Sequence, residues 1–328
     1  MAPRTREISE FAAIAGLKSL FRGVAAGVEL GIGDDAAVLR HSGRLVWTVD
    51  TAVEHVHFER AWLSLADLGW RSFHAAASDV SAMAGAPLAA LSSIVFPARF
   101  GAAELSELAR GQRAAARALG CAIIGGNLSR GAELSITTSV VGRVKRPLLR
   151  SGAKAGDELW LCGELGLAAA GLHLLQRGVR RPRGAAARRA LSAFRRPRAQ
   201  LAAGLALSGH ARAAIDISDG LAGDAAHLAQ ASRVRLSIDL AALQAALSPA
   251  LRALALELRL SALDLALYGG EDYALLATGP RRARPAEARV IGGVAKGSGV
   301  WLVEGGRQRR AGRGFEHSGG RAPRSVGA

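Results

Sequence analysis

The residues of this chain best suited to chemistry are acidic side chains that stand beside short apolar runs. They occur in residues 31–39 (GIGDDAAVL), 48–51 (TVDT), 77–86 (ASDVSAMAGA), 215–220 (IDISDG) and 268–275 (YGGEDYAL). A carboxylate at the edge of an apolar strand is costly to desolvate unless a cation lies beside it. None of these segments contains Lys or Arg, so the sequence predicts that a cation is supplied from elsewhere.

Magnesium is the cation that best fits this set of residues. It prefers oxygen ligands, keeps some of its waters and is usually shared between carboxylates and substrate phosphates. Carboxylates without histidines or thiolates indicate magnesium rather than zinc. Asp216 and Ser218 are two residues apart, which places them on one face of a strand, and Asp219 leads into a helix whose N-terminus favours phosphate. The pattern predicts a polyphosphate site that holds several Mg²⁺ ions.

Each segment also has a purely structural interpretation. Asp34, Asp35 and Asp50 suit turns or helix caps, and Asp219 suits an N-cap. Asp79 falls in a helical pattern, where a hydrogen-bonded carboxylate can be buried for packing alone. The joint occurrence of all these segments favours one shared site.

Familiar phosphate-binding loops are absent from the sequence. It contains neither G-x-x-x-x-G-K-[ST] nor a G-x-G-x-x-G that follows a strand and opens a helix. Residues 125–131 (GGNLSRG) follow an expected strand and offer backbone amides to phosphate, which is a weak signal by itself.

Strands and helices that must hold these residues alternate along the chain. In the first half, strands are expected at 45–50, 121–126 and 134–144, with helical patterns at 63–85 and 102–119. The second half restarts with a strand at 157–163, followed by helices at about 167–175 and 199–207. AAIDISDGL is expected to be a strand that runs into a helix, and it is followed by RLSIDL, a helical stretch to about residue 258, LALYGGEDYALLAT, the apolar piece ARVIGGVA and VWLVEGG. This order predicts an α/β fold. The Pro, Gly and basic residues of 147–156 suit a connection, so domains are expected at 1–148 and 149–328.

Composition excludes several other classes of protein. A chain of 328 residues with 50% hydrophobic and 21% charged residues is typical of a globular protein with two cores. No run of about 18 apolar residues lacks a charge, and the N-terminal residues do not form a secretory signal. We therefore expect a cytoplasmic protein with no membrane span. Cys121 and Cys162 stand in apolar runs, and we interpret them as buried side chains.

The net charge of +16 raises the possibility of nucleic-acid binding. Only Lys18, Lys145, Lys154 and Lys296 are lysines among 43 basic residues, which indicates a compositional bias toward arginine. The arginines gather at 177–198, at 281–289 and after 307, with Pro or Gly and few aromatic residues nearby. We interpret these segments as solvated loops and helix faces and expect no nucleic-acid partner.

The ordered set of motifs resembles the thiamine-monophosphate kinases, in the superfamily of aminoimidazole ribonucleotide synthetase. The motifs that carry the resemblance are VELGIGDDAAVL, VDTAVEHVHF, ASDVSAMAGAPLAAL, IIGGNLSRG, LLRSGAKAGDELWLCG, AIDISDGLAGDAAHLAQAS and LYGGEDYALL. IDISDGL together with GGEDY is highly specific. The resemblance implies two α/β domains, an N-terminal sheet that pairs with a second subunit in a homodimer, and phosphorylation of thiamine monophosphate by ATP.

The resemblance also implies roles for individual residues. It implies magnesium ligands at Asp35, Thr48, Val49 (through its carbonyl), Asp50, Asp79, Asn127, Asp216 and Asp219, of which Asp50, Asp79 and Asp216 act in catalysis. It implies ATP contacts at Gly126, Asn127, Arg150 and Ser218, and substrate contacts at His57, Glu271 and Phe315.

Three departures from the family pattern bear on activity. Asn127 stands where the family usually has Asp, Val49 replaces a usual Thr, and Glu54, His55 and Val56 replace a commoner small-polar run. Two alternatives therefore stay open: another ATP-using member of the superfamily with a different small substrate, and a nucleotide-binding protein with reduced activity. The absence of Cys before GIGDD disfavours a selenophosphate synthetase, and the absence of a C-terminal Cys disfavours the hydrogenase-maturation dehydratase.

Overall fold

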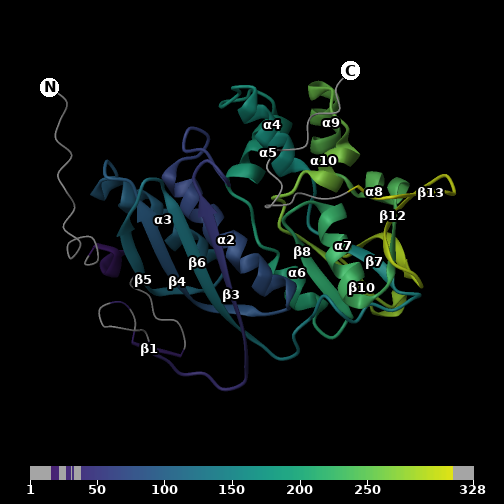
Figure 1. The fold of residues 1–328 in the computed structure, drawn as a ribbon, viewed down its shortest axis with the longest axis horizontal. Coiled ribbons are helices and arrows are strands. Elements are labelled where there is room, and N and C mark those ends of the chain that lie inside the picture. The colour runs from purple at the N-terminus through teal and green to yellow at the C-terminus, as the bar shows by residue number, and fades with distance from the viewer. Residues whose placement is uncertain (1–15, 22–26, 31, 33–37, 313–328) are drawn as a thin grey trace. The chain divides into compact units, whose positions relative to one another are not determined.

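The chain divides into two compact units, which are described separately below. The computed structural model describes residues 16–21, 27–30, 32 and 38–312. The first unit is Met1–Pro147 with Arg195–Leu205, and the second is Leu148–Phe194 with Ala206–Ala328 (Figure 1). No sequence signal assigned residues 195–205 to the first unit, and the domain boundary after residue 148 stays a prediction.

A mixed sheet forms the centre of the first unit. Within the described residues its strands lie in the order β3 (Arg44–Val53), β6 (Ser135–Val144), β4 (Ala86–Phe96) and β5 (Ala122–Arg130). β4 and β5 are parallel and are connected through a helix, whereas β6 is antiparallel to both of its neighbours. The short strands β1 (Val28–Leu30) and β2 (Val38–Leu39) form a separate antiparallel pair.

Two helices cover one face of this sheet. They are α2 (Leu65–Ala82) and α3 (Ala102–Ala118), and they share a core with the sheet that includes Phe73, Val80 and Val140. The N-terminus of α2 is fixed because Ser64 Oγ accepts a hydrogen bond from the Asp67 backbone N–H at 3.0 Å. Leu45, Trp47 and Val49 point to the opposite face and are exposed.

The sequence missed β4, because the apolar run APLAALSSIVF directly follows a helical pattern and lacks alternation. Most residues of β4 are buried and its exposed residue, Leu91, is apolar as well, so the run shows no alternation of apolar and polar residues. A second correction concerns residues 126–130, which lie within β5 and pair with β4 instead of forming a loop after a strand.

Residues 195–205 lie against α2 of the first unit. The Trp70 indole N–H donates to the Pro197 carbonyl at 2.7 Å, and the His74 ring Nδ1 accepts from the Ala199 backbone N–H at 3.1 Å. Arg196 lies 3.0 Å from the Asp67 carboxylate and stacks over the Trp70 ring. Side chains of α2 therefore hold a segment that is distant in sequence.

The second unit is built on a larger sheet. In the described part of the chain its strand order is β13 (Arg307–Arg310), β12 (Gly299–Glu304), β9 (Arg235–Asp239), β11 (Arg289–Ala295), β7 (Glu158–Cys162), β10 (Ala274–Gly279) and β8 (Ala213–Ile217). Only the β9–β12 pair of this sheet is parallel. β8 and β10 are buried along their whole length, as expected for their apolar sequences.

The helices that follow these strands complete the second unit. They are α4 (Leu167–Gln176), α5 (Ala185–Arg195), α7 (Leu221–Ser232), α8 (Leu240–Ala246), α9 (Pro249–Leu258) and α10 (Ala262–Tyr268), with a 3₁₀ turn, η1 (Arg281–Ala283). A further helix, α6 (Leu201–Leu207), lies mostly in the first unit. α5 ends at Arg195, where the segment 195–205 that belongs to the first unit begins, and α6 crosses the end of that segment. α5 falls in the Arg-rich region that the sequence analysis interpreted as loops and helix faces; its buried side includes Leu191 and Phe194.

Candidate active site

Two predicted ligands of the first unit are in direct contact. The Thr48 hydroxyl on β3 donates to the Asp79 carboxylate on α2 at 2.6 Å. Thr48 and Asp50 lie two residues apart and share the helix-covered face of β3, while the Val49 side chain points to the other face. The structure therefore brings Thr48 and Asp79 together and places Asp50 beside them on the same strand face, where it is exposed to solvent.

The strand register carries Asp50 and Gly126 onto one row of the sheet. Asp50 is opposite Thr138 on β6, Thr138 is opposite Ser92 on β4, and Ser92 is opposite Gly126 on β5. With strands about 4.8 Å apart, three steps separate Asp50 from Gly126 by roughly 14 Å. A methyl group at Gly126 would lie 1.8 Å from the Ser92 carbonyl oxygen, so only glycine fits this position.

Asn127, the departure from the family pattern, lies next to this row. Its side-chain amide donates to the Ser129 hydroxyl at 2.9 Å, and the residue is exposed. An aspartate could not donate this hydrogen bond through an ionised carboxylate.

The second unit places Asp216 at the buried end of β8. Its side chain is only 6% exposed. β8 ends at Ile217, so the prediction that Asp216 and Ser218 share a strand face is wrong, because Ser218 lies in the turn that follows. Ser218 and Asp219 occupy this turn, and α7 begins after Gly220.

Asp224 organises that turn, and the sequence analysis missed it. Its carboxylate accepts hydrogen bonds from the backbone N–H groups of Ser218 and Asp219, each at 3.0 Å. Burial, followed by the nearby charge of Asp216, raises the pKa of Asp224 to about 8. The available signal was an acidic residue in the first turn of the helix after IDISDG, a position that can reach back to the preceding amides.

The loop with sequence GGEDY is bound to the same turn. The backbone N–H of Glu271 donates to the Ser218 carbonyl at 2.7 Å, and that of Tyr273 donates to the Ile217 carbonyl at 2.8 Å. The Tyr273 hydroxyl donates to the Glu271 carboxylate at 2.6 Å. Gly270 has a φ of +71°, and a methyl group there would lie 2.6 Å from the Ser218 carbonyl oxygen. The two most specific motifs of the sequence therefore form one interlocked structure.

Asp272 is a second acidic residue that the sequence analysis did not single out. Its carboxylate accepts from the Gly166 N–H at 2.7 Å and from the Ala168 N–H at 3.4 Å. Because Gly166 caps α4 without a side chain, Asp272 satisfies amides that a local cap would otherwise serve. Burial raises the pKa of Asp272 to about 8. Its position indicates a structural role beside Glu271.

The remaining predicted residues have the following positions. His57 is half-buried in the turn after β3, and its ring Nδ1 accepts from the Val53 backbone N–H at 3.1 Å. Arg150 is exposed, and its carbonyl accepts from the Ser232 hydroxyl at 2.8 Å. Asp35 and Phe315 lie outside the described residues. Their expected roles stay predictions.

The chemistry of the donors fits a hard divalent cation. In the second unit the buried Asp216 carboxylate, and in the first unit the Thr48 hydroxyl and the Asp79 carboxylate, are each oxygen donors of the kind that Mg²⁺ prefers. Among the described residues, no three His, Cys, Asp or Glu side chains gather into a metal site. Mg²⁺ commonly takes only one or two carboxylates and completes its shell with water and substrate phosphate. The side chains present therefore fit an ion that is bound together with a nucleotide.

Two family models match the chain. The AIR synthase related protein N-terminal domain matches residues 33–144, and the corresponding C-terminal domain matches residues 154–300. In the described part of the chain, no helix is both long enough and apolar enough to cross a membrane.

Similar proteins cover nearly the whole chain. The thiamine-monophosphate kinase of Mycobacterium tuberculosis (strain ATCC 25618 / H37Rv) is 38% identical over 93% of this chain and 90% of its own length. That of Aquifex aeolicus (strain VF5) is 33% identical over 91% of this chain and 95% of its own length.

Solved structures similar to this chain include further thiamine-monophosphate kinases. The thiamine-monophosphate kinase from Stenotrophomonas maltophilia K279a has a TM-score of 0.80 and 33% identity, over 90% of this chain and 97% of that one. A structure of AaThiL complexed with AMPPCP and TMP also has a TM-score of 0.80, with 30% identity over 97% of this chain and 99% of that one. The hydrogenase maturation protein HypE, at 18% identity and a TM-score of 0.75, shares the fold. On these grounds the chain belongs to the AIR synthase related family and, within it, to the thiamine-monophosphate kinases.

Proposed function

We propose that this protein transfers the γ-phosphoryl group of ATP to thiamine monophosphate and forms thiamine diphosphate and ADP in the cytoplasm. The observation that carries the proposal is the similarity over 97% of the chain to a structure with AMPPCP and TMP bound. The hydrogen bond between Glu271 and the Ser218 turn, next to the buried Asp216 at the end of β8, supports it.

The reaction is a direct in-line transfer. A phosphate oxygen of the acceptor forms a bond to the γ-phosphorus, the bond from that phosphorus to the β,γ-bridging oxygen breaks, and ADP keeps the electron pair. A phosphate monoester has a second pKa of about 6 and is ionised at neutral pH, so no strong general base is required. Positioning and neutralisation of charge then account for catalysis.

The residues have separate roles in this proposal. Asp50, Asp79 and Asp216 hold Mg²⁺, with Asp35, Thr48, Asn127, Asp219 and the Val49 carbonyl as further ligands. Bound Mg²⁺ supplies neutralisation of the charge on the phosphoryl oxygens. Gly126, Asn127, Arg150 and Ser218 contact the nucleotide, and His57, Glu271 and Phe315 contact the acceptor.

The same proposal includes a homodimer. Leu45, Trp47, Val49 and Leu91 are large apolar side chains exposed on the sheet of the first unit. Soluble monomers rarely expose contiguous apolar surface of this kind. The face of the sheet that α2 and α3 leave uncovered is therefore assigned to a second copy of the chain.

The test is a coupled assay of ADP release across a panel of phosphorylated acceptors, with thiamine diphosphate measured directly. Asp216→Asn is expected to lower kcat by about 100-fold, as for loss of one preorganised charge-stabilising group. The control is Asp264→Asn, which changes an exposed carboxylate of α10 and should leave kcat unchanged. ADP release that does not depend on thiamine monophosphate, or full activity in Asp216→Asn, would refute the proposal.

Asn127→Asp separates a kinase from a nucleotide-binding protein of reduced activity. A rise in kcat for this variant would show that the neutral amide limits turnover. Unchanged turnover, with ATP binding intact, would show that the amide is adapted to this site.

A further inference from the structure

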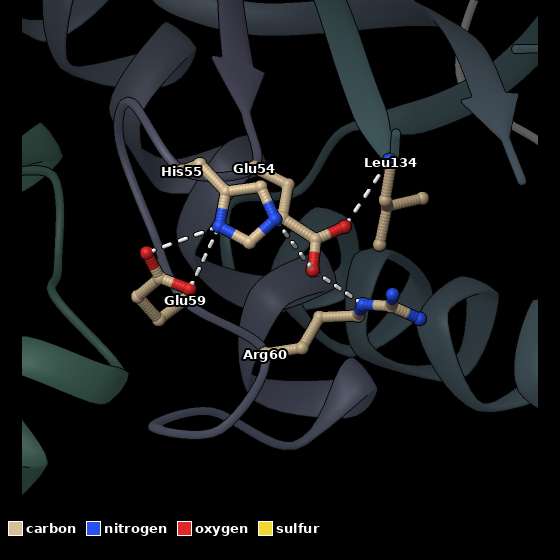
Figure 2. Close-up of polar contacts among 5 residues, drawn as sticks. All are labelled: Glu54, His55, Glu59, Arg60 and Leu134. Carbon is tan, nitrogen blue, oxygen red and sulfur yellow. Dashed lines mark hydrogen bonds and ion pairs between the residues drawn. The ribbon is translucent and has the colours of Figure 1, made fainter. Parts of the chain in front are cut away.

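One buried carboxylate, that of Glu54, lies between Arg60 and Leu134 (Figure 2). Glu54 stands at the start of the turn that also contains His57. Glu54 is only 3% exposed, although it directly follows the last residue of β3. Its Oε1 accepts from the Arg60 Nε–H at 2.5 Å, and its Oε2 accepts from the Leu134 backbone N–H at 3.3 Å. The Glu54 backbone N–H in turn donates to the Leu134 carbonyl at 3.0 Å.

The geometry of the chain explains why a carboxylate is needed at this position. The β3–β6 ladder ends at the Val53–Ser135 pair, and the chain turns away at His55, which has a φ of +66°. Leu134 therefore has no strand carbonyl to receive its N–H, and the Glu54 side chain takes that place. A buried N–H without an acceptor is strongly unfavourable. Glu54 thus ties the end of β3, the start of β6 and Arg60 together.

His57 is oriented inside this closed turn. Its backbone N–H donates to the Val53 carbonyl at 2.9 Å, and its ring Nδ1 accepts from the Val53 N–H at 3.1 Å. A nitrogen that accepts a hydrogen bond carries no proton in the neutral ring, so this geometry assigns the proton to Nε2. The Nε2–H group is then a donor suited to an anionic oxygen.

We propose that Glu54 is a positioning residue which, through Arg60 and Leu134, fixes His57 so that its Nε2–H donates to a phosphate oxygen of the acceptor. This inference rests on the proposed function, because it takes the acceptor to be thiamine monophosphate. Glu54 does not touch the substrate in this scheme. It acts through the turn.

The same loop offers a matched control. Glu59 lies 3.0 Å from the His55 ring at the surface and makes neither of the two bonds that close the turn. Glu59→Gln therefore removes a carboxylate five residues away and leaves the Glu54–Arg60 pair in place. Glutamine has only one acceptor oxygen, so in Glu54→Gln the side-chain NH₂ group faces either the Arg60 Nε–H or the Leu134 backbone N–H. One of the two hydrogen bonds is then lost.

The first experiment reads the His57 ring directly and needs no turnover. Long-range ¹H–¹⁵N spectra of the ¹⁵N-labelled full chain, with His57 assigned from His57→Gln, should show the Nε2–H form in the wild type and in Glu59→Gln. Glu54→Gln and Arg60→Gln should show averaged tautomers at His57. Arg60 is 45% exposed, so its variant keeps the test decisive if Glu54→Gln does not fold. An unchanged His57 spectrum in the folded variants would overturn the proposal.

The second experiment is kinetic. In Glu54→Gln and Arg60→Gln the KM for thiamine monophosphate should rise by about tenfold, the size expected for one charge-assisted hydrogen bond, while the KM for ATP stays within about twofold. Equal rises in both KM values would reveal a general structural defect and contradict the proposal. If the wild type does not phosphorylate thiamine monophosphate, the proposed function fails, and the His57 spectra still decide whether Glu54 fixes the ring.

Discussion

At the scale of single residues, the site of the second unit depends on acidic side chains that serve backbone amides. Asp224 accepts from two consecutive N–H groups in the turn of Ser218 and Asp219, and Asp272 accepts from the first amides of α4. Neither residue needs to touch a substrate to be essential. Each holds in place a neighbour that the proposed reaction uses.

We expect substitutions of Asp224 to lower the free energy of unfolding. Replacing it with alanine leaves the half-buried amides of Ser218 and Asp219 without this acceptor, which should reduce the free energy of unfolding by about 3 kcal/mol. Because the pKa of about 8 keeps much of this carboxyl protonated at pH 7, Asp224→Asn should lose far less. Urea unfolding at pH 7 measures both values. Equal losses in the two variants would show that charge at this position matters more than the hydrogen bonds.

At the scale of elements, the segment 195–205 is secured to α2 by a neutral histidine. Burial, with a contribution from the Arg198 charge, lowers the pKa of His74 to about 4. Protonation would remove the Nδ1 acceptor that the Ala199 N–H uses. The attachment of this segment should therefore weaken in acid.

The sign of the pH effect follows from the two pKa values of His74. In the unfolded chain the ring takes up a proton near pH 6.5, and in the folded protein only near pH 4, so its stabilising effect is complete above pH 6.5 and declines as the pH falls toward 4. Between pH 7 and 4.5 the wild type should lose about 2 kcal/mol more than His74→Gln, which does not titrate. Urea unfolding at both pH values tests this. A parallel decline of the two proteins would exclude His74 as the cause.

At the scale of the whole molecule, the exposed face of the first sheet is the feature that the proposed dimer explains. Trp47 is 76% exposed, although its indole N–H donates to the Ser139 hydroxyl on the neighbouring strand at 2.7 Å. Aromatic residues with an apolar body and one polar group are enriched at protein interfaces.

Trp47→Asp should therefore weaken the dimer. The dissociation constant of the dimer should rise by about 30-fold or more, as for loss of an aromatic residue that contributes about 2 kcal/mol per interface. Analytical ultracentrifugation over a concentration series measures it. Leu256→Asp, at an 82% exposed position of α9, is the control and should not change the association. A monomeric wild type, or a dimer that tolerates Trp47→Asp, would remove the assignment of this face.

The sequence by itself was sufficient for the α/β class, for most of the strands and helices, and for the family. Apolar patterns marked β3, β6, β8, α2 and α3, because local pattern and burial agree in those elements. The motifs IDISDG and GGEDY stood out because acidic residues beside apolar strands are costly without a partner.

Only the tertiary structure decided which residues support the site. Glu54, Asp224 and Asp272 bind amides at Leu134, Ser218 and Gly166, and two of these pairs are 80 and 106 residues apart. Likewise, residues 195–205 belong to the first unit through contacts with α2, and these contacts cannot be predicted from the sequence pattern of the segment itself. The physical reason is that hydrophobic periodicity is a property of neighbours along the chain, whereas the partner of a buried polar group is set by how distant segments pack.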